Sequence, residues 1–235
     1  MRILAFETSA KAASVAVLED GKLLGEYYQN SGQTHSRTVM KMAEDLLANC
    51  DLTVGDIDAA AVAAGPGSFT GVRIGVAAAK GFAWGREVPC CGVSTLESMA
   101  WSSGLLDGVV VAAMDARRSQ VYTAAFRMEN GVPERLLDDS AIAVEELGAW
   151  LKTVEGRKVL VGDGAQLCYN TLGQEIEDLH LMPEHLRMQR AGGVALAAWQ
   201  RLSRGEPADA AVLTPTYLRL SQAERERLER QKTNH

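Results

Sequence analysis

One stretch of this chain predicts a helix that has no polar face. Residues 71–84 contain two charged side chains, Arg73 and Lys80, and are otherwise mostly glycine, alanine and valine. They follow a predicted apolar strand, 59–64, and a Gly65-Pro66-Gly67 turn. A helix that is apolar all round must be covered on more than one side. We therefore predict that a sheet covers one side and that a second body covers the other.

Small residues recur along this helix at the spacing of one helical face. Gly71, Gly75 and Ala79 form a groove that would let another helix approach closely, although the same groove would also suit tight packing on the chain's own sheet. A second predicted helix, 34–50, has an apolar arc broad enough to support the partner interpretation. The predicted partner-facing residues are Met40, Ala43, Leu47, Gly71, Gly75 and Ala79. On this interpretation Gly75→Leu blocks pairing and leaves the fold intact.

The order of the predicted elements occurs twice. A strand ending on Glu7, a hairpin at Asp20-Gly21, a helix and a strand ending on Gly65 come first. A strand ending on Asp115, a turn at Asn130-Gly131, a helix and a strand ending on Gly162 follow. This duplication predicts two α/β lobes, 1–104 and 105–221, with a charged tail at 222–235. The arrangement resembles the actin/Hsp70-like ATPase (ASKHA) superfamily, here with a reduced second lobe.

Several residues could contact an anion or a nucleotide between the two lobes. Glu7 and Asp115 each end the first strand of a lobe and could hold a magnesium–nucleotide complex, or could cap a turn. Gly65 and Gly67 precede a helix N-terminus, which attracts anions, but a tight turn needs the same glycines without any ligand. Arg73, one turn into the helix, fits either interpretation.

Composition limits the classes of partner and compartment. The 235-residue chain has a net charge of -6, which argues against a free-standing nucleic-acid binder. Its four cysteines form no Cys-x-x-Cys motif, as expected for free thiols in the reducing cytoplasm. No apolar run approaches the roughly 18 residues of a membrane span. The four histidines form no convincing ligand set, so we predict no metal site, and Gly192-Gly193 is interpreted as a plain helix start.

The first lobe carries a long specific motif. The run Ala63–Gly75, together with Lys80-Gly81 and Gly92–Leu96, resembles the TsaB (YeaZ) family, the accessory subunits for threonylcarbamoyl-adenosine synthesis on tRNA. Ser94 and Glu97 also form a predicted capping box at a helix start. In the related catalytic subunit TsaD this helix carries two metal-binding histidines, and here Thr95 and Met99 take their places. A hydroxyl and a thioether replace imidazoles poorly, which argues against catalysis.

The resemblance implies a function without chemistry of its own. It implies a cytoplasmic, non-catalytic subunit that binds and activates TsaD together with the ATPase TsaE, contacts tRNA only through that complex, and forms a homodimer when alone. No cofactor is expected on the isolated chain, although ATP or ADP could bind at the partner interface. Position 7 departs from the family pattern, because Glu7 stands where an aspartate is usual. A small-molecule kinase, a glycoprotease-type metalloenzyme and a peptidase stay open as alternatives.

Overall fold

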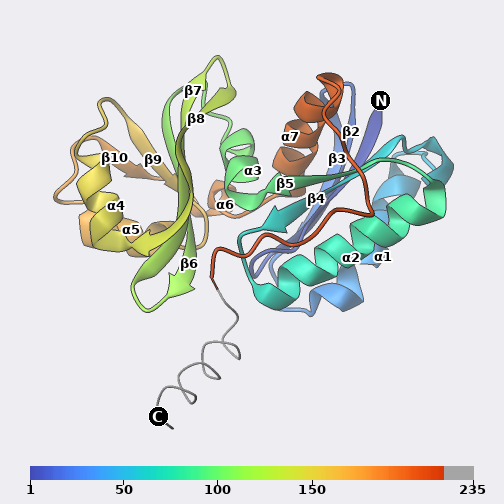
Figure 1. Ribbon diagram of the computed structural model, residues 1–235, viewed down its shortest axis with the longest axis horizontal. Helices are drawn as coiled ribbons and strands as arrows, with labels where there is room; N and C mark the ends of the chain where they lie inside the picture. The colour runs from blue at the N-terminus through green and yellow to red at the C-terminus, as the bar shows by residue number, and fades with distance from the viewer. Residues whose placement is uncertain (220–235) are drawn as a thin grey trace, which may run out of the picture.

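The computed structural model describes residues 1–219 and shows two lobes side by side (Figure 1). Each lobe is built on a five-stranded sheet, in the order β3-β2-β1-β4-β5 in lobe I and β8-β7-β6-β9-β10 in lobe II. In both sheets three antiparallel strands joined by hairpins are followed by two parallel strands. This repeated topology confirms the predicted two-lobed α/β fold of the actin/Hsp70-like ATPase type.

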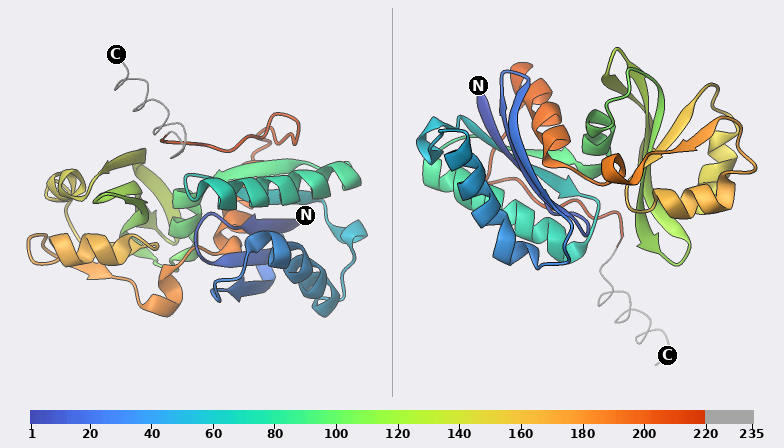
Figure 2. Two further views of the ribbon diagram at one scale, coloured as in Figure 1. Left: turned by 90° about the horizontal axis from the view of Figure 1, so that it is seen from below. Right: turned by 180° about the vertical axis from the view of Figure 1, so that it is seen from behind.

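Lobe I follows the predicted elements closely. Its strands and helices are β1 (Arg2–Glu7), β2 (Ala13–Glu19), β3 (Lys22–Gln29), α1 (His35–Asn49), η1 (Val54–Asp56), β4 (Ala59–Gly65), α2 (Phe69–Arg86) and β5 (Cys90–Ser94). The hairpin between β2 and β3 turns on Asp20-Gly21, and both residues have positive φ, as a tight two-residue hairpin requires. β4 is buried along its whole length because helices cover both faces of the sheet (Figure 2).

Lobe II keeps all five strands of the repeat. After α3 (Thr95–Ser102), its elements are β6 (Asp107–Arg117), β7 (Gln120–Glu129), β8 (Val132–Ala143), α4 (Val144–Leu151), β9 (Lys158–Val161), α5 (Ala165–Leu172), β10 (Leu179–Leu181) and α6 (Glu184–Arg187). The predicted reduction is therefore confined to the length of elements, such as the three-residue β10 and the eight-residue α4 and α5. The sequence patterns did not predict α5, β10 or α6.

The predicted end of the second lobe at residue 221 is wrong. α7 (Ala191–Ser203) crosses back to lobe I, where its alanine-rich face packs on β1, β2 and β4. Small side chains such as Ala195 and Ala198 let the helix lie close to this sheet, and both are fully buried. Lobe II thus ends before α7, and the last part of the described chain belongs to lobe I.

The helices arrange the molecule in layers. α1 and α2 cover the outer face of the lobe I sheet, and α4 and α5 cover the outer face of the lobe II sheet (Figure 2). α7 and α3 lie between the two sheets, with α7 on the lobe I sheet and α3 on the lobe II sheet (Figure 1). Within residues 1–219, no helix is both long enough and apolar enough to span a membrane.

The segment 206–219, which we call the strap, runs from the end of α7 back along α2 to the junction of the lobes (Figure 1). The Thr216 amide donates to the Ala64 carbonyl at 2.7 Å. The Lys80 ammonium donates to the Leu213 carbonyl at 2.9 Å. The strap therefore supplies part of the second cover that α2 needs, from within the same chain. The predicted charged tail at 222–235 lies outside the described residues.

Candidate functional site

The small-residue groove of α2 faces the chain's own sheet. Gly71 and Gly75 lie against Thr8, which follows β1 directly. The Thr8 hydroxyl donates to the Gly71 carbonyl at 2.7 Å. A Cβ atom at Gly71 would overlap the Thr8 carbonyl, and one at Gly75 would overlap the Thr8 hydroxyl. The prediction that a partner helix enters this groove is therefore wrong, because the chain itself fills it.

Most other residues of the predicted partner surface are also buried within lobe I. Ala43 and Leu47 of α1 and Ala79 of α2 belong to the core between these helices and the sheet. Met40 is the exception, with 48% of its surface exposed on α1. Helical spacing identifies the face of a helix that is packed. It does not distinguish packing on the chain's own sheet from packing on a partner protein.

A different row of α2 residues faces solvent. We define the outer stripe as Thr70, Arg73, Ala77, Gly81 and Trp84, all of which are exposed. Trp84 is 63% exposed, and a Cβ added at Gly81 would meet no atom within 4 Å. The stripe carries a single charge, that of Arg73, and the other two charged residues of α2, Lys80 and Arg86, are half-buried.

Gly65 and Gly67, two of the predicted anion contacts, lie against backbone of other segments of the chain. Gly65 has a φ of +117°, which favours glycine, and a Cβ there would overlap the Thr216 carbonyl of the strap. A Cβ at Gly67 would lie 2.6 Å from the Ser9 carbonyl, which also accepts the Ser68 amide at 2.7 Å. Both glycines thus allow other backbone segments to approach, which is the ligand-free interpretation of the turn.

Arg73 is held by two aromatic rings. Its guanidinium lies 3.7 Å from the centroid of the Phe69 ring, and its Nε donates to the Tyr217 hydroxyl at 2.7 Å. The Phe69 and Tyr217 rings stack at 4.8 Å. Arg73 therefore joins the outer stripe to the strap, a contact that spacing could not predict because the two partners lie far apart in the chain.

A cleft of about 520 Å³ opens between the lobes. Ser9, Lys11 and Gly67 line it from lobe I, and Asp115 and Asp163 line it from lobe II. Asp115 is exposed there, and its Oδ1 accepts the Arg117 amide at 2.7 Å. Glu7 does not line the cleft, so the structure does not place the two predicted acids together on its wall.

Glu7 is fully buried beneath the cleft. Its Oε1 accepts the Ser9 amide at 2.6 Å, and its Oε2 has no partner among the described residues. Burial raises the pKa of this carboxyl to about 7, hydrogen bonding from Ser9 opposes the rise, and the nearby charge of Asp163 adds to it. A buried carboxyl that is half protonated near neutral pH fits a magnesium–nucleotide complex poorly. Both acids accept an amide two residues on, as turn caps do.

Because the pKa of Glu7 is higher in the folded chain than its ordinary value of 4.5, the unfolded chain loses this proton first as the pH rises. The free energy of unfolding should therefore fall between pH 4.5 and about 7, by about 3 kcal/mol from this group. Glu7→Gln should match the native chain in acid and exceed its stability at pH 8. Urea unfolding at both pH values measures this, with exposed Glu44→Gln as the control. An unchanged pH dependence in Glu7→Gln would contradict it.

The α3 helix forms only half of the predicted capping box, and it buries the two residues that stand in the positions of the TsaD histidines. Thr95 and Met99 are both buried, and Met99 packs in the lobe II core, so their hydroxyl and thioether do not form a metal-binding pair. Within residues 1–219, no three His, Cys, Asp or Glu side chains gather around a possible metal position. The Ser94 hydroxyl accepts the Glu97 amide at 3.3 Å as predicted. The Glu97 carboxylate does not reach back to cap the helix, because it binds Arg201.

The Gly192-Gly193 segment is a helix start, as predicted. The Gly192 amide donates to Oε1 of Glu26 at 2.9 Å, and the Ala191 amide donates to the Ser14 hydroxyl at 3.2 Å. Side chains of lobe I therefore satisfy the first amides of α7.

Comparison with known proteins identifies the family. A sequence model described as TsaD, tRNA N6-adenosine threonylcarbamoyltransferase, matches residues 28–227. The chain is 33% identical to the tRNA threonylcarbamoyladenosine biosynthesis protein TsaB of Bacillus subtilis, over 99% of this chain and 100% of that protein. The chain belongs to the TsaB (YeaZ) family. TsaB of Escherichia coli is 35% identical over 93% of this chain and 95% of its own length.

Solved structures of the TsaB (YeaZ) family agree with this assignment. YeaZ from Pseudomonas aeruginosa superimposes with a TM-score of 0.74 and 25% identity, covering 92% of this chain and 99% of that one. A second Pseudomonas aeruginosa structure, described as an uncharacterized protein with similarity to peptidase YEAZ, gives a TM-score of 0.81 and 26% identity over 93% of this chain and 99% of its own. The motif Ala63–Gly75 thus correctly indicated the TsaB family.

Proposed function

We propose that this chain is a non-catalytic subunit required for N6-threonylcarbamoyladenosine modification of tRNA. In this role it binds and activates a TsaD homologue together with the ATPase TsaE, in the cytoplasm. The names of its TsaB relatives support the pathway, and the buried Thr95 and Met99 on α3 support the absence of metal chemistry. Because the chain has a net charge of -6, we propose that it meets tRNA only through the complex.

The observation that carries the partner proposal is the outer stripe of α2. The sheet covers one side of this helix and the strap covers part of another, yet Ala77, Gly81 and Trp84 still face solvent. Exposed Met40 adds an apolar side chain on the neighbouring α1. An apolar, nearly uncharged helix surface with small residues suits a protein partner that packs closely. We propose that a TsaD homologue covers it, and that a second copy does so when the chain is alone.

The proposed cofactor arrangement follows from the buried acid. Glu7 lies beneath the cleft instead of on its wall, so we propose that the isolated chain binds no nucleotide. ATP or ADP would then bind only where the partner supplies further ligands. Magnesium-dependent ATP turnover by the purified chain would contradict this and would favour the kinase alternative.

Gly81→Arg tests the partner surface. The new side chain enters open space, so the fold should be retained, and replacing a mid-helix glycine should if anything stabilise α2. Affinity for the TsaD homologue should fall at least about 100-fold, since a bulky charge would be buried against an apolar partner. Isothermal titration calorimetry measures this, with exposed Asn170→Arg on α5 as the control. Native affinity of Gly81→Arg would place the interface elsewhere.

The pathway itself is tested in cells. Depletion of this protein followed by mass analysis of tRNA nucleosides should show loss of N6-threonylcarbamoyladenosine, and re-expression of the native chain should restore it. Retention of the modified nucleoside after depletion would refute the proposed function. Restoration by Gly81→Arg would show that partner binding through the outer stripe is not required.

A further inference from the structure

The two lobes meet through a close contact between α3 and α7 (Figure 1). α3 packs on the lobe II sheet through Leu96, Met99 and Ala100, whereas α7 packs on the lobe I sheet. The helices approach closely because Gly193 has no side chain. A Cβ at Gly193 would overlap both the Ser98 carbonyl and the Ser102 hydroxyl. Since these backbones touch, rotation of one lobe on the other requires the two helices to separate.

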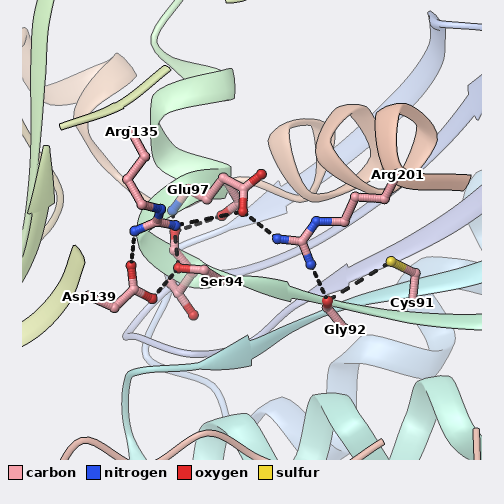
Figure 3. A network of polar contacts seen from close by, with 9 residues as sticks. Cys91, Gly92, Ser94, Glu97, Arg135, Asp139 and Arg201 are labelled. Carbon is pink, nitrogen blue, oxygen red and sulfur yellow. Dashed lines mark hydrogen bonds and ion pairs between the residues drawn. The ribbon is translucent and has the colours of Figure 1, made fainter. Parts of the chain in front are cut away.

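A single carboxylate joins guanidinium groups from both sides of this contact (Figure 3). Oε2 of Glu97, on α3, accepts from Nη2 of Arg201 on α7 at 2.5 Å. The same oxygen lies 3.8 Å from Nη2 of Arg135 on β8 of lobe II. Arg201 also donates at 3.0 Å to the carbonyl of Gly92 on β5, the edge strand of the lobe I sheet. Glu97 therefore links lobe I to lobe II through one side chain.

The lobe II end of this link is held in place as well. Nη1 of Arg135 donates to Oδ1 of Asp139 at 2.5 Å, and Oδ2 of Asp139 accepts from the Ser94 hydroxyl at 2.5 Å (Figure 3). The Arg135 guanidinium also lies 4.7 Å from the centroid of the Phe126 ring. The side chains of Glu97 and Asp139 are each only 19% exposed. Salt screens such a partly buried network much less than it screens an exposed ion pair.

We propose that the Glu97 network, comprising Ser94, Glu97, Arg135, Asp139 and Arg201, locks the two lobes at one angle. The chain is then a rigid two-lobed body, unlike proteins whose lobes close around a ligand by a hinge. A second tie acts elsewhere in the interface, where Nη1 of Arg219 in the strap donates to the Ala116 carbonyl of lobe II at 2.8 Å. If one lobe rotated on the other about the Glu97 network, the hydrogen bond from Arg219 to Ala116 would break, and the reverse also holds. This proposal does not depend on the proposed function.

The test is the distribution of distances between the lobes in the full chain. Spin labels on unnatural amino acids at Ala48 of α1 and Ala149 of α4, both exposed, avoid the four native cysteines. Double electron–electron resonance should give one narrow distribution, unchanged by magnesium-ATP. Glu97→Gln keeps the shape of the side chain but loses the charge that binds both guanidinium groups. It should broaden the distribution at least about twofold.

Matched variants distinguish the loss of the contact between the lobes from the loss of any one charge. Glu19→Gln breaks an ion pair with Arg2 of similar length, 2.7 Å, that lies wholly within lobe I, and should leave the distribution native. Arg201→Gln, which removes the charged partner of Glu97 on lobe I, should broaden it as Glu97→Gln does. Two distances in the native chain, a shift on adding magnesium-ATP, native width in both network variants, or equal broadening by Glu19→Gln would each overturn the proposal. Circular dichroism confirms that each variant is folded.

Discussion

Gly75→Leu is expected to destabilise lobe I, contrary to the expectation from the sequence that this substitution leaves the fold intact. Gly75 lies where α2 crosses the end of β1, and Thr8 fills the space that a side chain at Gly75 would occupy. The Thr8 hydroxyl is hydrogen-bonded to the Gly71 carbonyl. A Cβ at Gly75 would also lie 3.2 Å from Cγ2 of Val62 on β4. Leucine would therefore push α2 away from β4, which is buried along its whole length. We expect a loss of at least about 3 kcal/mol in the free energy of unfolding.

Gly81→Leu is the control for this prediction because it places the same side chain on the solvent-facing side of the same helix. Its Cβ meets no neighbour within 4 Å, so stability should be unchanged or should rise by up to about 1 kcal/mol. Urea unfolding of both variants and of the native chain measures the difference. Equal stability of the two variants would show that α2 does not present Gly71 and Gly75 to the sheet.

Removal of the strap should lower the stability of the chain by a similar amount. A chain that ends after Gly205 loses Leu213, whose Cδ1 lies 2.5 Å from the place of a Cβ at Gly92, so the leucine occupies the space that this glycine leaves. It also loses the hydrogen bond from the Thr216 amide to the Ala64 carbonyl and the stacking of Tyr217 on Phe69. Burial of one leucine contributes about 2 kcal/mol, the hydrogen bond about 1 kcal/mol and the stacked aromatic pair about 1 kcal/mol. We expect a total loss of about 4 kcal/mol.

A chain that ends after Arg219 is the control, because it keeps the strap and lacks only the residues that follow it. This control keeps every contact named above, so the difference in urea midpoint between the two shortened chains measures the strap alone. Hydrogen exchange should show the loss of protection in the shorter chain concentrated in α2 and β4, which the strap covers. Native protection of these elements in the chain ending after Gly205 would mean that the strap does not stabilise α2.

The prediction that α2 needs a second cover is confirmed in part, and the strap that supplies some of this cover was not predicted. The near absence of polar residues in 71–84 required cover on more than one side. The strap supplies part of this cover through Leu213 and Tyr217. No local pattern relates residues 213–217 to α2, because the contact joins segments more than a hundred residues apart. The need for cover is a property of one helix, whereas the identity of the cover is a property of the whole fold.

The candidate site shows the same division. Gly71, Gly75 and Ala79 have the same spacing as Ala77, Gly81 and Gly85, so the helix carries two rows of small residues. Either row could face a partner, because spacing alone does not distinguish them. The structure turns that row inward because Val72 and Val76 lie beside it, and burying these larger side chains gains more than burying alanine and glycine. The second row, with Trp84 beside it, stays exposed.

The order of amino acids alone was enough to predict two lobes of like topology, most strands and helices, the turns at Asp20-Gly21 and Asn130-Gly131, and the family. These depend on short-range periodicity and turn chemistry, which act within about 20 residues. The return of α7 to lobe I, the strap, the burial of Glu7 and the Glu97 network depended on the tertiary structure. Each is a contact between distant segments, whose free energy depends on complementary shape and charge that no local pattern encodes.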